Sequence, residues 1–196
     1  MAPTFNFTSD PTLSSFAVNL QTYIASDPGR ETSSADTVKF QYVAVGAIVF
    51  ASSDPERVLL VQRAATDSAP NRWEVPGGAA DFEDPSILHS VARELWEETG
   101  LTAETIGPQV SDEVVFLTRS GKMVCKFHFL VEAKRNSTGA LNVMLDPKEH
   151  QNYLWVTEEQ VRARRVDDRD LKFTSKDQEA AIIEGFEVRR RLKGER

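Results

Sequence analysis

The sequence predicts a single domain of the α/β class that follows a short N-terminal extension. Residues 40–50 (FQYVAVGAIVF) are almost all apolar or β-branched, as expected of a strand buried on both faces of a sheet. Residues 85–99 instead place Leu88, Val91 and Leu95 at helical spacing. With 196 residues and no internal repeat, the chain has the size of one domain around one substantial core.

The extension comprises residues 1–37, which are polar and rich in Ser, Thr and Asp. Asp10-Pro11 is typical of a helix start. Apolar residues follow at helical spacing, namely Leu13, Phe16, Leu20 and Ile24. We therefore expect one short helix and then a loop over residues 26–37. This segment could be a lid, but an N-terminal appendage to a domain over residues 38–196 is the favoured interpretation.

Later strands are indicated by short apolar runs between turn residues. We expect them at residues 58–61, 73–75, 113–118, 123–133 and 153–156. Ser120-Gly121 would join the third and fourth of these into a hairpin.

The helix over residues 85–99 has signals at both ends. Asp84 is the expected N-cap, Pro85 the first helical residue and Gly100 the stop. Further on, Thr157 and Gln160 form a capping box that starts another helix. A last helix is expected over residues 175–192.

Composition excludes several classes of partner. A net charge of −7 would repel a nucleic-acid backbone, so we expect no nucleic-acid scaffold. No apolar run approaches the roughly 18 residues of a membrane span, and the first residues lack a signal-peptide pattern. The single cysteine, Cys125, fits a reducing compartment. We expect a cytoplasmic protein; its oligomeric state cannot be predicted from the sequence.

The informative chemistry lies in residues 77–101 (GGAADFEDPSILHSVARELWEETGL). Glu94, Glu97 and Glu98 share one arc of the helix, because residues three and four apart lie on the same face. Their mutual repulsion turns into attraction when a divalent cation with oxygen ligands is bound. The Arg93 guanidinium can hold the carboxylate of Glu97, which lies one helical turn later, and can neutralise the charge of a loop acid such as Glu83. The alternative is a solvated acidic face, but the buried opposite stripe and the preceding Gly-Gly turn favour a metal site.

This segment resembles the signature of the Nudix hydrolase family. Residues 93–101 (RELWEETGL) match the second half of that signature at every specified place. The first half departs from it, because eight residues instead of seven separate its expected acid position from Arg93. The isolated acid of the signature is therefore Asp84, Glu83 or Asp81.

The resemblance implies a Nudix-type α/β/α sandwich with a mixed central sheet. It also implies Mg²⁺-dependent hydrolysis of the diphosphate linkage of a nucleoside diphosphate derivative, with Mn²⁺ as a substitute for Mg²⁺. The implied metal ligands are Glu94, Glu97, Glu98 and the Gly77 carbonyl. Arg93 belongs to the implied catalytic set, and the general base is Glu98 or Glu149.

The similarity covers the chain from about residue 42 to the C-terminal helix. Residues 62–65 and 73–78 resemble MutT-type nucleoside triphosphate pyrophosphohydrolases, which favours (deoxy)nucleoside triphosphates as substrates. Arg63 would meet a phosphate or the leaving group. The expected substrate-binding residues are Arg63, Glu74, Val75, Pro76, Gly77 and Gly78. His150, next to Glu149, could serve as the general base instead, but it is interpreted as a surface residue.

Three alternative functions remain open from the sequence alone. An isopentenyl diphosphate isomerase type is disfavoured, because it uses a cysteine near the start of the sheet and Cys125 lies far along the chain. A nucleotide-binding sensor without turnover is a second reading, supported by the irregular first half of the signature. A hydrolase of non-nucleoside diphosphates is the third.

Overall fold

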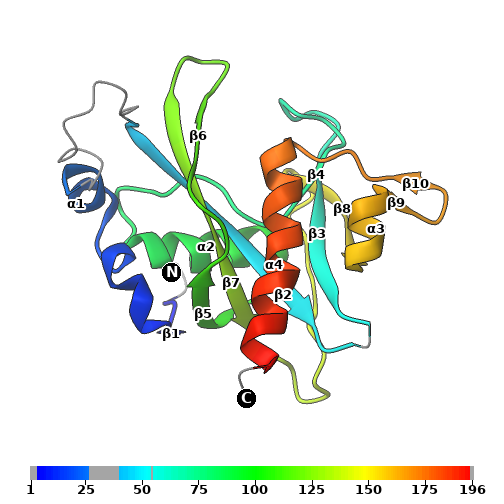
Figure 1. Cartoon of the computed structure of the whole chain (residues 1–196). Helices are drawn as coiled ribbons and strands as arrows, with labels where there is room; N and C mark the ends of the chain where they lie inside the picture. Colours follow the sequence, from blue (N-terminus) through cyan, green and yellow to red (C-terminus); the bar gives the residue numbers. More distant parts are fainter. Residues whose placement is uncertain (1–3, 27–39, 54, 195–196) are drawn as a thin grey trace.

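The computed structural model describes residues 4–26, 40–53 and 55–194, and these build a mixed sheet between two layers of helices (Figure 1). The strands of the main sheet are β1 (Thr8–Ser9), β2 (Tyr42–Ala51), β3 (Arg57–Arg63), β4 (Trp73–Glu74), β5 (Ala103–Gln109), β6 (Val114–Leu117), β7 (Met123–Ala133) and β8 (His150–Val156). Their order is β1-β5-β7-β2-β3-β4, with β6 beside β7 and β8 beside β3. The α/β class and the mixed sheet expected from the sequence are confirmed.

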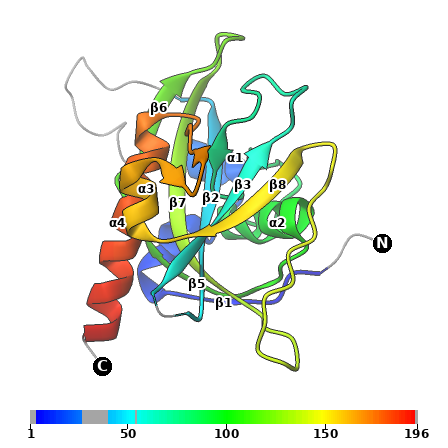
Figure 2. The same cartoon turned by 90° about the vertical axis from the view of Figure 1, so that its right-hand side faces the viewer.

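The helices divide between the two faces of this sheet. One face carries α2 (Ile87–Thr99), the 3₁₀ helix η1 (Pro11–Phe16) and α1 (Leu20–Ala25). The other carries α3 (Glu158–Ala163) and α4 (Lys176–Gly194), as Figure 2 shows from the side. None of the helices in the described residues is long and apolar enough to cross a membrane.

The central strands β2 and β7 run parallel and send alternate side chains to opposite faces. Cys125, Phe127 and Phe129 of β7 join the core beneath α2. Leu130 packs into the second core beneath α4, and His128 faces the same side. The register of β7 therefore decides which of its residues reach the α4 face.

The N-terminal segment is built into this fold. The expected single helix is wrong: two short helices replace it, because Asn19 has an extended backbone and its side chain caps the second helix at the Thr22 N–H. Asp10 caps η1 as predicted, and β1 adds a parallel strand beside β5. The Phe16 ring packs edge-on against Phe127 and Phe129. Residues 27–37 of the expected loop lie outside the described residues.

Helix α2 begins two residues later than predicted. Its N-cap is Ser86, whose hydroxyl accepts a hydrogen bond from the His89 N–H, so Asp84 and Pro85 precede the helix. Asp84 does not cap because its carboxylate binds Arg93 instead. Gly100 ends the helix in the left-handed conformation (φ 68°), as the sequence indicated.

Four strands were not predicted: β1, β5, β9 and β10. β5 (AETIGPQ) mixes polar residues with Gly and Pro, so it lacks the alternation that marks a strand. β9 (Arg165–Val166) and β10 (Arg169–Asp170) form a hairpin of two residues a side, too short for any pattern. The capping box of Thr157 and Gln160 that begins α3 is confirmed.

Candidate functional site

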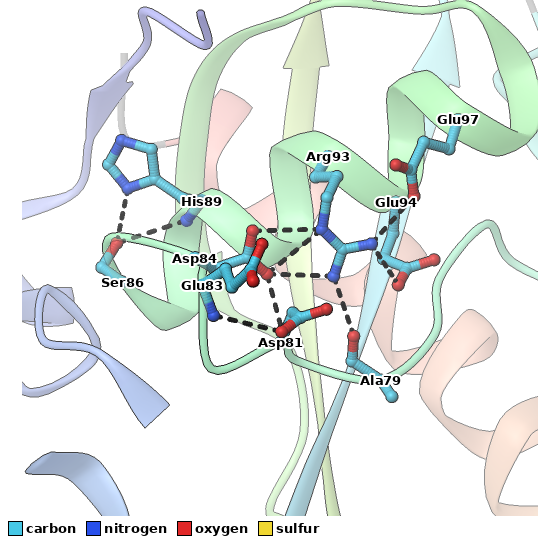
Figure 3. A network of polar contacts seen from close by, with 9 residues as sticks. All are labelled: Ala79, Asp81, Glu83, Asp84, Ser86, His89, Arg93, Glu94 and Glu97. Atoms are coloured by element: carbon cyan, nitrogen blue, oxygen red, sulfur yellow. Dashed lines mark hydrogen bonds and ion pairs between the residues drawn. The ribbon is translucent and has the colours of Figure 1, made fainter. Parts of the chain in front are cut away.

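Arg93 is the centre of a polar network on one side of α2 (Figure 3). Its Nε and Nη2 donate to the Asp84 carboxylate, and Nη2 also donates to the Ala79 carbonyl oxygen at 2.9 Å. Its Nη1 donates to Glu94 Oε1 and to Glu97 Oε2, each at 2.8 Å. Because a guanidinium has five N–H donors, all five are engaged. Arg93 therefore orients carboxylates and has no donor left for another group.

The network also shows which of the three loop acids pairs with Arg93. Asp84, not Glu83 or Asp81, pairs with Arg93, and its side chain is only 10% exposed. Asp81 instead accepts hydrogen bonds within the loop from the Glu83 N–H. The extra loop residue thus leaves the ion pair between the loop acid and the helix arginine intact.

Glu98 lies one turn after Glu94 on the same arc of the helix and is buried against the Gly77 backbone. It is 4% exposed, and its Oε2 accepts a hydrogen bond of 2.7 Å from the Gly77 N–H. Burial raises the pKa of Glu98 well above its ordinary value, and the neighbouring Glu94, Glu74 and Glu149 raise it further. A bound cation would offset this raised pKa, because it favours the charged carboxylate.

The Gly77-Gly78 turn fits between the helix and the sheet only because neither residue has a side chain. A Cβ on Gly77 (φ 154°) would lie 2.1 Å from the Val45 carbonyl oxygen. A Cβ on Gly78 would lie 2.6 Å from Glu94 Oε2. The two glycines let the backbone pass directly beside two of the carboxylates.

Glu74 and His150 extend the site from strands β4 and β8. His150 Nε2 lies 3.8 Å from Glu74 Oε1 and 4.0 Å from Glu98 Oε1. His150 is 2% exposed, so its interpretation as a surface residue is wrong: it starts β8, which pairs with Arg63 of β3. Neither of its ring nitrogens has a hydrogen-bond partner among the described residues. Burial would raise the pKa of Glu74, but the nearby His150, Lys126 and Arg63 together lower it.

These residues fit a hard divalent cation. Glu98, Glu149 and His150 can each offer one ligand atom, and these three atoms lie within 4.8 Å of one another. Arg93 occupies only one oxygen of Glu94 and one of Glu97, so each keeps a second oxygen. Clustered carboxylate oxygens are typical ligands of Mg²⁺ and Mn²⁺.

Arg63 ends β3 at the rim of a cavity. Its guanidinium is held by Asp67 through two hydrogen bonds of 2.8 and 2.7 Å and by Glu74 at 2.5 Å. Three of its five N–H donors are thus engaged and two are left for a further acceptor. Asp67 was not predicted from the sequence, because only the folded turn brings this loop acid back to Arg63.

The cavity has a volume of about 490 Å³ and lies on the α4 side of the sheet. Glu74, Gly77 and Gly78 line it, whereas Val75 is fully buried in the core. The Pro76 carbonyl oxygen accepts a hydrogen bond from the Ala47 N–H of β2. Within the expected substrate-binding run, Val75 and Pro76 therefore hold the backbone in place. Sequence reasoning missed Lys126, His128 and Gln178, which also line this cavity.

Comparison with known proteins places residues 41–176 under the family description "NUDIX domain". The human m7GpppN-mRNA hydrolase NUDT17 is 45% identical over 60 residues, which are 30% of this chain and 18% of the relative. The match thus spans about a fifth of that relative's length.

Two solved structures share the fold. The MutT protein of Methanosarcina mazei Go1 superposes with a TM-score of 0.57 at 24% identity, over 80% of this chain and 99% of that one. The NUDIX domain of Shewanella oneidensis NrtR, solved with ADP ribose, gives a TM-score of 0.57 at 22% identity, over 88% of this chain and 97% of that one.

Proposed function

This chain belongs to the NUDIX family, and we propose that it hydrolyses the diphosphate linkage of a nucleoside diphosphate derivative in a reaction that requires Mg²⁺. One observation carries the proposal. Glu98 is buried, and Glu94, Glu149 and His150 surround it. The Gly77 N–H binds its carboxylate, and the Gly77-Gly78 backbone also lines the cavity. A cluster of acids beside a cavity is a suitable place for a cation and a polyphosphate.

Glu94, Glu97, Glu98 and the Gly77 carbonyl would hold the cation, and Glu149 and His150 lie beside Glu98. When bound, Mg²⁺ neutralises the charge that develops on phosphate oxygens during displacement by water. Arg93 acts through other residues, because it orients Glu94 and Glu97 and cannot also contact substrate. Arg63 has two N–H donors with which to bind an oxygen of the phosphate chain or of the leaving group.

Of the two candidates for the general base, we favour Glu149. Glu149 is exposed, so its carboxylate can reach a water molecule from solvent. Glu98 is buried, and its Oε2 is taken by the Gly77 N–H. Glu149→Gln should then lower kcat, whereas Glu98→Gln should weaken cation binding.

A nucleoside triphosphate is the substrate that we propose. A cavity of about 490 Å³ lies within the range of small-molecule sites and is large enough for a nucleoside. The NrtR domain was solved with ADP ribose and the NUDT17 hydrolase is named for m7GpppN-mRNA, and both of these compounds contain a nucleotide.

A nucleotide-binding module without turnover is the second candidate. The observation that favours it is the pairing of Arg93 with two of the three helix carboxylates, Glu94 and Glu97. Such a module would bind nucleotides and leave them intact.

The test is a panel of nucleoside triphosphates, nucleotide sugars, dinucleotide polyphosphates and non-nucleoside diphosphates, incubated with and without Mg²⁺. Products are identified by phosphorus NMR. We expect Mg²⁺-dependent cleavage of at least one nucleoside triphosphate. Binding without cleavage of any compound would favour the module, and cleavage of non-nucleoside diphosphates alone would refute the nucleotide assignment. Glu159→Gln, a matched change at an exposed position of α3, should leave turnover unchanged.

A further inference from the structure

The cavity beside the carboxylate site contains polar groups that the proposed hydrolysis does not use. Its walls come from the β6–β7 hairpin, the loop at residues 77–79 and the residues that lead into α4. Figure 1 shows the hairpin and the first turn of α4 at the same end of the molecule. The apolar part of the wall is formed by Val114, Phe116 and Val124.

Two of the polar side chains are buried and carry nitrogens without a hydrogen-bond partner among the described residues. His128 is 1% exposed, and neither of its ring nitrogens has a hydrogen-bond partner among the described residues. Gln178 is 3% exposed; its Oε1 accepts a hydrogen bond of 3.2 Å from Lys126 Nζ, but its Nε2 has no partner. Buried donors and acceptors are normally paired, so three unpaired nitrogens at one cavity indicate a ligand that pairs them.

The neighbouring strand β2 leaves space for the His128 imidazole. Gly46 of β2 lies directly opposite His128 in the parallel register. A Cβ at Gly46 would lie 2.6 Å from His128 Cδ2. The ring therefore packs against bare backbone, which fixes its position on the cavity wall.

The chemistry of these groups selects an uncharged ring with a polar edge. Burial, with the positive charge of Lys126, lowers the pKa of His128 to about 3, so the imidazole is neutral and offers one donor and one acceptor. The Gln178 amide adds a further donor. The cationic side chains of the lining, Arg63 and Lys126, suit a phosphate. The neutral His128 and Gln178 match the edge of a heteroaromatic ring, which can lie against Phe116 with its face.

We propose that this cavity receives the nucleobase of the substrate and that His128 and Gln178 determine which base is accepted by hydrogen bonding to its edge. The inference rests on the proposed function, because the phosphates of such a nucleotide would then extend past Gly77 and Gly78 towards Glu98. Phe116 and the apolar wall supply contact that does not distinguish one base from another.

Binding of reaction products in the absence of metal tests this inference without hydrolysis. Titration calorimetry in chelator would compare the four nucleoside monophosphates with ribose 5-phosphate, which lacks the base. We expect the intact protein to bind at least one nucleoside monophosphate roughly tenfold or more tightly than ribose 5-phosphate, as a few hydrogen bonds and a ring contact would give.

His128→Leu and Gln178→Leu should each reduce this ratio several-fold and flatten the preference among bases. His128→Gln keeps a polar side chain and serves as a second variant if the leucine variant does not fold. His89→Leu, a matched histidine on α2 outside the cavity, should leave the ratio unchanged. Equal binding of ribose 5-phosphate and all four nucleotides, no binding of any, or variants that keep the full ratio would overturn the inference. A preserved base preference in a protein that cleaves nothing would refute only the proposed function.

Discussion

Replacing Arg93 with Met should destabilise the metal-free protein, because it removes the one cation that three acids share. Asp84 and Glu94, whose side chains are 10% and 12% exposed, would lose their counter-charge in a poorly solvated place. Glu97 is 47% exposed and would be re-solvated by water at little cost. The destabilisation therefore comes from two of the three ion pairs.

Removing one partner of a buried ion pair costs about 3–5 kcal/mol. The side chain of Arg93 is itself 20% exposed, so we expect the low end, about 3 kcal/mol. For a chain of this size that corresponds to a fall in the melting temperature of roughly 6–12 °C.

Urea and thermal denaturation in chelator would measure this loss. The matched control is Arg162→Met, since Arg162 also pairs with a glutamate four residues away but is 51% exposed. The control should lose less than about 1 kcal/mol. If Arg93→Met were no more destabilising than Arg162→Met, the network would not orient the carboxylates as described.

Three further predictions concern the cation, the buried acid and the N-terminal segment. A chelator should abolish hydrolysis while the near-ultraviolet circular dichroism of the protein stays unchanged, because the ion is catalytic; unfolding on chelation would point to a structural metal. Without metal, Glu98→Gln should be more stable than the parent protein at alkaline pH, and this advantage should shrink as the pH falls. The reason is that Glu98 has a raised pKa when folded, so its protonated form is favoured by folding and stability is lost as the pH rises through that pKa; an advantage that grew towards acid pH in denaturation curves would contradict this. Phe16→Ala should cost about 3–5 kcal/mol in urea denaturation, because the ring is buried against Phe127 and Phe129; a cost below about 1 kcal/mol would make the segment a loose appendage.

The sequence predicts those parts of the fold whose patterns are local. The buried run of β2, the stripe of α2 with its stop at Gly100, and the capping box at Thr157 all appear where expected. β5 escaped prediction because it is stabilised by pairing with β7 across the sheet and not by its own alternation. The break between η1 and α1 depends on one capping side chain, Asn19, inside an otherwise helical pattern.

In the candidate site, too, local sequence patterns predict some contacts and the tertiary fold determines the others. Spacing on one helix brings Arg93 to Glu97 by simple periodicity, and the structure has this ion pair. The choice of Asp84 over Glu83 depends on how the loop folds back, which no periodicity describes. His150 and His128 come from strands whose register places them in buried positions. Alternation along β7 could have assigned His128 to the α4 face, but not to a cavity.

The acids of α2 are proposed to bind a divalent ion that also contacts the diphosphate of the substrate. The most direct test of this proposal is kcat/KM for a nucleoside triphosphate at saturating Mg²⁺, compared between the parent protein, Glu98→Gln and Glu159→Gln. We expect Glu98→Gln to lose a factor on the order of 10³ while remaining folded, and Glu159→Gln to lose nothing. Near-normal turnover by folded Glu98→Gln would contradict the role given to this acid and the site built around it.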